Sequence, residues 1–255
     1  MTFNSLRIIN TVSFMGVVAV NFLAVSLPLN GLTPGEISAK FQSEFAPAGY
    51  TFSIWSIIYG LILGITIWQF VGKNQLKEDA IAKIGFRFSA NAFLNAAWLF
   101  AWHFLQLGLS VVLMVGILYS LIQLNNVISF QILPELNARK WLKAAFGIYL
   151  GWICIALIAN VAATLVGWQW QHLGFSITFW TGSMIGIGAC ILIAIALFYQ
   201  NPFIALAGIW ALTGIMVRQI NVNDVFTPIA WASATWIMPL FVSIFYSNRR
   251  KKVKT

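Results

Sequence analysis

The sequence predicts an all-α, polytopic integral membrane protein, a helical bundle with about eight transmembrane helices. Three observations predict this class: 60% of the residues are hydrophobic, only 8% are charged, and the mean hydropathy is +0.85. Such values are typical of a chain whose main solvent is lipid.

Eight apolar runs, separated by short polar connections, have about the length that crosses roughly 30 Å of hydrocarbon. We expect the spans at residues 8–28, 51–71, 86–107, 109–132, 144–167, 175–199, 203–217 and 228–246. The seventh run is the shortest. The longest connection, residues 29–50, is too short to be a soluble catalytic domain.

The cations orient the bundle, because eight spans place both ends of the chain on one side of the membrane. Arg7, the clusters at 73–87 and 139–143, and the tail at 249–254 fall on that side, and only Lys40 and Arg218 fall on the other. By the positive-inside rule both termini are cytoplasmic, and we expect a bacterial cytoplasmic membrane. The net charge of +9 is then an orientation signal that gives no reason to expect a nucleic-acid partner.

The first span has a second interpretation. Arg7 followed by an apolar run that ends at Ala24-Val25-Ser26 also fits a cleavable signal peptide. The run is long for that purpose, and its polar residues Asn10, Ser13 and Asn21 are more typical of a helix that packs against others.

Residues that the sequence lacks narrow the chemistry. No predicted span contains Asp or Glu, which disfavours a proton-coupled pump. No glycine-rich phosphate loop occurs, and His103 and His172 lie in separate segments without other metal ligands nearby. We therefore expect no enzyme activity, no metal site and no required cofactor, and a membrane enzyme acting on a bound ligand is the weakest alternative.

Three predicted spans carry aromatic and amide side chains on one helical face. A polar side chain in hydrocarbon is unfavourable unless it packs against protein or lines a cavity. The faces comprise Phe52, Trp55 and Tyr59 in the second span, Asn91, Asn95, Trp98 and Trp102 in the third, and Tyr149, Trp152 and Asn160 in the fifth. Because all three lie at a similar expected depth, they predict an aromatic pocket in the outer half that binds a hydrophobic small molecule. The alternative is that the amides only join helices.

These residues also resemble a known family. The run Pro47-Ala48-Gly49-Tyr50-Thr51-Phe52, with Trp55 and Tyr59, resembles the entry to the second helix of the tryptophan-rich sensory protein family, also called translocator protein or TspO. Asn95 with Trp98 is similar to its third-helix motif, and Tyr149-Leu150-Gly151-Trp152 with Asn160 is similar to its fifth. The chain departs from the family at Tyr50, where Trp is usual, and at Trp102 and His103, which replace a Phe pair.

The resemblance covers roughly residues 8–167 and implies a five-helix unit at 1–167, followed at 168–255 by three further helices and a basic cytoplasmic tail. It implies a membrane sensor or carrier that binds a flat ligand such as a porphyrin or a sterol. From its position above the expected pocket, and not from the resemblance, we also expect the connection at 29–50 to act as a lid. The implied contacts come from Tyr50, Trp55, Asn95, Trp98, Trp152 and Asn160.

Two further expectations remain open. One is a permease subunit that moves an amphipathic substrate with a separate energy source, as the alternative to a sensor or carrier. The other is a homodimer, because Gly182 and Gly186 allow close helix approach within one chain or between two.

Overall fold

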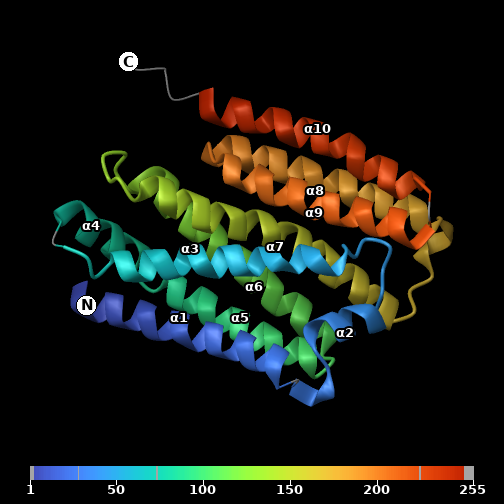
Figure 1. The fold of residues 1–255 in the computed structure, drawn as a ribbon, viewed down its shortest axis with the longest axis horizontal. Coiled ribbons are helices and arrows are strands. Elements are labelled where there is room, and N and C mark those ends of the chain that lie inside the picture. The colour runs from blue at the N-terminus through green and yellow to red at the C-terminus, as the bar shows by residue number, and fades with distance from the viewer. Residues whose placement is uncertain (1–2, 28, 73, 224, 250–255) are drawn as a thin grey trace. The chain divides into compact units, whose positions relative to one another are not determined.

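The computed structural model describes residues 3–27, 29–72, 74–223 and 225–249 of the chain (Figure 1). Within these ranges there is no strand, and seven helical segments are long and apolar enough to cross a membrane. The predicted all-α, multi-pass fold is therefore confirmed. Several residues used to orient the chain lie outside the described ranges, namely Lys73 and the tail residues Arg250, Lys251, Lys252 and Lys254.

The chain divides into two compact units. One comprises Met1–Ile37 and Trp55–Gly147, and the other comprises Ser38–Ile54 and Ile148–Thr255. The cut falls within the helix α7, Arg139–Gly167, which contributes to both units. The division into domains at residue 167 stays a prediction.

In the first unit, α5 packs against both α1 and α6, and the short helix α4 packs against α1. Helix α5 contains five alanines, whose small side chains allow neighbouring helices to approach closely. The elements are α1 (Phe3–Ser26), η1 (Leu29–Gly31), α2 (Pro34–Lys40), α3 (Ile54–Trp68), α4 (Gln75–Ile84), α5 (Arg87–His103), α6 (Leu107–Asn126) and the π-helical turn η3 (Val127–Gln131). The last three residues of α2 and the first residue of α3 fall in the other unit.

Polar side chains join α1 to α5. The Asn21 amide donates to the Asn95 side-chain oxygen at 3.3 Å, and the Ser89 hydroxyl donates to the Asn10 side-chain oxygen at 3.2 Å. Interhelical hydrogen bonds of this kind stabilise helix pairs in lipid. They support the interpretation of α1 as a packed helix rather than a signal peptide.

In the second unit, α8, α9 and α10 pack against one another, and the short helix η2 packs against α9. Glycines allow two of the close approaches, because an added Cβ at Gly188 would lie 3.0 Å from Ile158 and one at Gly186 would lie 3.4 Å from Trp236. The elements are η2 (Gly49–Ser53), α7, η4 (His172–Gly174), α8 (Ile177–Tyr199), α9 (Pro202–Asn223) and α10 (Pro228–Arg249).

Two spans differ from expectation in length. Helix α5 has 17 residues, at the lower limit for crossing the hydrocarbon. Helix α9 has 22 residues, so the expected run of 203–217 was too short. The apolar run in the sequence ends before Arg218. The helix continues through Arg218 because the Arg218 side chain is hydrogen-bonded to another part of the unit. The two short helices α2 and α4 were not expected.

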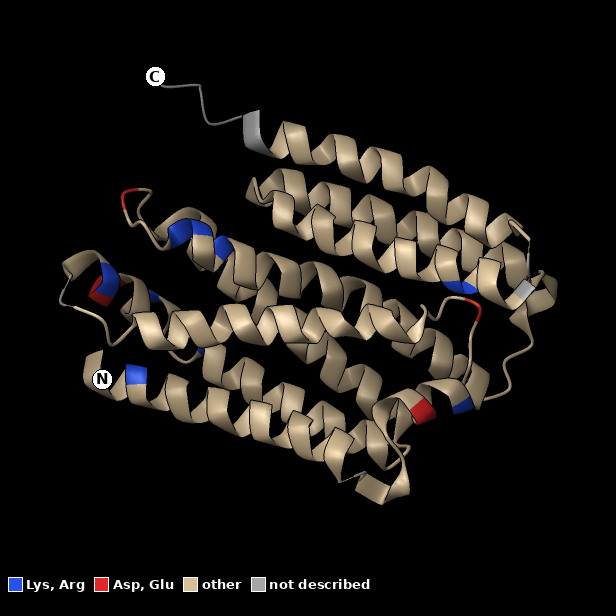
Figure 2. Ribbon diagram, viewed as in Figure 1, with Lys and Arg blue, Asp and Glu red and all other residues tan. Residues whose placement is uncertain are grey.

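Charged residues lie mainly near helix ends and connections (Figure 2). In the first unit, several of these cations donate to carbonyls at helix C-termini. The Lys77 ammonium donates to the Val71 and Gly72 carbonyls after α3, and the Arg139 guanidinium donates to the Ile128 and Ser129 carbonyls of η3 at 3.2 and 2.7 Å. Such bonds satisfy carbonyls that have no partner within the helix and complement its dipole.

Replacement of Arg139 by Met should lower the thermal unfolding midpoint of the purified protein, because two charge-assisted hydrogen bonds to η3 are lost. Each such bond contributes about 1.5–3 kcal/mol when well shielded, and partial exposure brings the expected total to about 2 kcal/mol. Lys140→Met is the matched control, since that exposed side chain is the next in the helix. Equal midpoints for the two variants would contradict the capping role of Arg139.

Candidate functional site

Ten of the predicted site residues, Asn91 aside, divide equally between the two units. Tyr50, Phe52, Tyr149, Trp152 and Asn160 belong to the second, and Trp55, Tyr59, Asn95, Trp98 and Trp102 belong to the first.

In the second unit, η2 brings Tyr50 and Phe52 to aromatic partners on two different helices. The Phe52 ring meets the Trp152 ring of α7 edge-on, with centroids 5.8 Å apart. The Tyr50 ring meets the Trp210 ring of α9 edge-on at 5.6 Å. These are favourable arrangements for aromatic pairs. The predicted residues Phe52 and Trp152 are therefore in contact, although 100 positions separate them in the chain.

Trp152 is the best-shielded aromatic residue of this group, with 2% of its surface exposed. Its indole Nε1–H is buried and has no hydrogen-bond partner among the described residues. A buried donor without an acceptor is unfavourable by about 1–3 kcal/mol. Tyr149 and Asn160, on the same helical face, are also buried. This face of α7 therefore carries a buried N–H donor, without a partner among the described residues, on the side chain that contacts the Phe52 ring.

In the first unit, the aromatic residues form stacked pairs. The Trp55 and Tyr59 rings stack with centroids 5.4 Å apart, and the Trp98 and Trp102 rings stack at 6.1 Å. Asn95, which the sequence placed in the pocket wall, is 1% exposed and accepts the bond from Asn21 described above. Helix packing thus accounts for at least part of the role of Asn95.

One histidine and one glutamate of the first unit have defined hydrogen bonds. His103 is fully buried, and its Nδ1 lies 2.8 Å from the Leu99 carbonyl one turn earlier, as in a packed helix. No group of three or more metal-ligating side chains occurs in the described part of the chain. At the start of α2, hydrogen bonds from the Thr33 backbone and hydroxyl hold the pKa of Glu36 below its ordinary value of 4.5.

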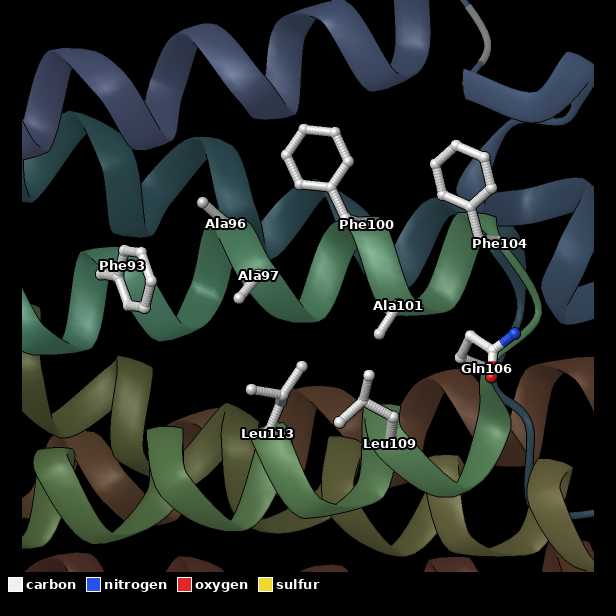
Figure 3. A pocket seen from close by; sticks show the side chains of 9 residues that line it. All are labelled: Phe93, Ala96, Ala97, Phe100, Ala101, Phe104, Gln106, Leu109 and Leu113. Carbon is white, nitrogen blue, oxygen red and sulfur yellow. The ribbon is translucent and has the colours of Figure 1, made fainter.

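A groove of about 600 Å³ opens between α5 and α6 in the first unit. Figure 3 shows Ala97 and Ala101 pointing toward Leu113 and Leu109, with Gln106 at the connection between the helices. None of the ten predicted residues lines this groove. Its apolar lining and open mouth fit a surface that lipid chains cover.

Two residues at the aromatic cluster of the second unit were not expected from the sequence. Trp210 contacts Tyr50, and its indole N–H donates to the Thr51 carbonyl at 2.8 Å. Gly214, one turn later on α9, accepts a bond from the Ala48 backbone N–H at 3.0 Å. The only signal for Trp210 was its aromatic character, since α9 repeats none of the motifs in the first five spans.

The comparisons with known proteins give one match. The family model described as TSPO-like protein matches residues 7–246, which includes the three helices beyond residue 167. No curated protein and no solved structure matches the chain.

Proposed function

Because the chain belongs to the TSPO-like protein family, we propose that it binds a flat hydrophobic ligand of the porphyrin or sterol kind and acts as a sensor or carrier. Membership of the family indicates a membrane sensor or binding protein in general, and such proteins are generally not enzymes. The ligand, its site and its effect are our proposal. The cell membrane, the cytoplasmic termini and a homodimer belong to the same proposal.

The observation that carries the proposal is the buried Trp152 indole N–H, for which the described part of the chain offers no acceptor. Hydrocarbon cannot accept that bond, so an acceptor on a ligand would remove an unfavourable state. The Phe52 ring at 5.8 Å and the buried amide of Asn160 on the same helical face add an aromatic surface and a second polar group. A flat, largely apolar ligand with a carbonyl or carboxylate edge matches these groups.

Titration of the detergent-purified protein with protoporphyrin, followed through the absorbance of the pigment, tests the proposal. Trp152→Phe keeps an aromatic ring but removes the N–H, so we expect the dissociation constant to rise about tenfold, the effect of one buried hydrogen bond. Asn160→Leu should also weaken binding.

Trp168→Phe is the matched control, because Trp168 follows α7 and is 66% exposed. It should bind as the wild type does. Non-saturating uptake of equal strength by all of these proteins would mean that the pigment only partitions into the detergent, and the proposal would be wrong.

A further inference from the structure

The C-terminal half of α9 is hydrogen-bonded to the chain segment that carries Tyr50 and leads to Phe52. The Arg218 Nη1 donates to the Ser43 carbonyl at 2.8 Å and to the Ala46 carbonyl at 2.9 Å. The Gln219 amide donates to the Glu44 backbone carbonyl at 3.0 Å and to its carboxylate at 2.6 Å. Both side chains come from the last turns of α9, and these four acceptors lie in the connection before η2.

The same segment is joined to α9 at two further levels. One turn before Arg218, the Gly214 carbonyl accepts the Ala48 N–H at 3.0 Å, and one turn before that, Trp210 donates to the Thr51 carbonyl at 2.8 Å. Residues 43–51 are thus bonded along about three turns of one helix. A connection with this many bonds to a packed helix is more firmly held than an ordinary surface loop.

Arg218 was one of two exceptions to the positive-inside rule. A cation on the outer side adds nothing to the orientation signal. Its guanidinium instead satisfies two backbone carbonyls of an irregular segment, which would otherwise need water or other donors. Gln219 is 2% exposed, so its two bonds are shielded from water as well.

We infer that α9 is a tether for residues 43–53, and that Arg218 and Gln219 are positioning residues that set how fast a ligand exchanges at Phe52 and Trp152. Helix α9 then holds the wall of the ligand site, which gives the C-terminal helices a role in binding. The lid role expected for the connection at 29–50 can then apply only to the part before Ser43, because the rest is bonded to α9. The statement on exchange rests on the proposed function, whereas the statement on the tether does not.

Hydrogen–deuterium exchange of peptides that cover residues 43–53 tests the tether without any ligand. Arg218→Met removes both bonds and keeps a long side chain, and we expect exchange in this segment to become at least about tenfold faster, because bonds to charged donors are the strong ones. Exchange in Arg218→Lys should be faster than in the wild type and slower than in Arg218→Met. Lys40→Met, at the other outer cation, is the control and should leave the exchange unchanged. Unchanged exchange in Arg218→Met, or an equal rise in Lys40→Met, would overturn the tether.

Gln219→Met provides a second variant with the same expected direction, should Arg218→Met fail to yield folded protein. The protoporphyrin dissociation rate is then measured for each folded variant, and it should rise several-fold in Arg218→Met and Gln219→Met. If deuterium exchange becomes faster while the protoporphyrin dissociation rate stays unchanged, then α9 does not control how fast the ligand leaves, and that part of the inference is wrong. Absence of saturable binding in the wild type would instead contradict the proposed function and leave the deuterium result to decide the tether.

Discussion

Replacement of Gly151 by Ala should destabilise the second unit, although the same change in most helices is favourable. An added Cβ at Gly151 of α7 would lie 2.5 Å from the Ile204 carbonyl oxygen and 2.9 Å from the Ala207 Cβ of α9. The nearest obstacle is backbone, so no side-chain rotation relieves the contact. Overpacking of this kind costs about 1–3 kcal/mol, and we expect the upper end.

The control for Gly151→Ala is Gly182→Ala in α8. No atom lies within 4 Å of a Cβ added at Gly182, so this variant should gain stability through helix propensity. Thermal unfolding midpoints in detergent should therefore move in opposite directions. A shift in the same direction for both would contradict the close approach of α7 and α9. Gly151 precedes Trp152, so Gly151→Ala should also weaken protoporphyrin binding.

The fold class could be predicted from the sequence because transmembrane helices are specified by composition and length, which are local properties. The helix ends were less predictable. The run at 203–217 stopped short of the end of α9 because a charged residue normally ends an apolar run. Arg218 is accommodated within the helix by carbonyls of residues 43 and 46, about 170 positions away, and no local pattern carries that information.

The candidate site was predictable in part. Helical spacing predicts that Trp152 and Asn160 share one face of α7, and the structure shows that both are buried, while their role in binding stays a prediction. Spacing along one helix does not say what a side chain meets, and so the bond between Asn95 and Asn21 was not foreseen. Trp210 was missed for a related reason. Its partners are Tyr50 and Thr51, and Thr51 lies 159 residues earlier in the chain, so no local pattern around Trp210 indicates these contacts.

The extent of the family relationship was also underestimated. The recognisable motifs end at Asn160, and on that basis the resemblance was predicted to cover roughly residues 8–167. The family match continues to residue 246. The structure gives a physical reason why the last helices belong with the motifs. Segment 43–51, which leads into the aromatic motif, forms one compact unit with α9.

Replacement of Gly214 by Ala should destabilise the second unit about as much as replacement of Gly151, because Gly214 of α9 packs closely against Thr51 of η2. A Cβ added at Gly214 would lie 2.1 Å from the Thr51 hydroxyl oxygen and 2.8 Å from its methyl group. Thr51 is fully buried, so its side chain has no free space to enter. Gly214→Ala should therefore displace η2 from α9 and lower the free energy of unfolding by about 2–3 kcal/mol.

A second substitution separates this contact from a general effect on α9. The Thr51 hydroxyl is buried without a hydrogen-bond partner among the described residues, so Thr51→Ala removes an unfavourable group together with one methyl, and we expect a change below about 1 kcal/mol. The double variant Gly214→Ala/Thr51→Ala lacks the Thr51 hydroxyl and methyl groups, which are the two atoms nearest to the added Cβ. The Cβ of residue 51 still lies 3.0 Å from the Cβ added at residue 214. Stability should then recover in part, with a coupling of about 1 kcal/mol or more between the two sites. Strictly additive effects in unfolding measurements would mean that Gly214→Ala acts through the α9 backbone and not through its contact with η2.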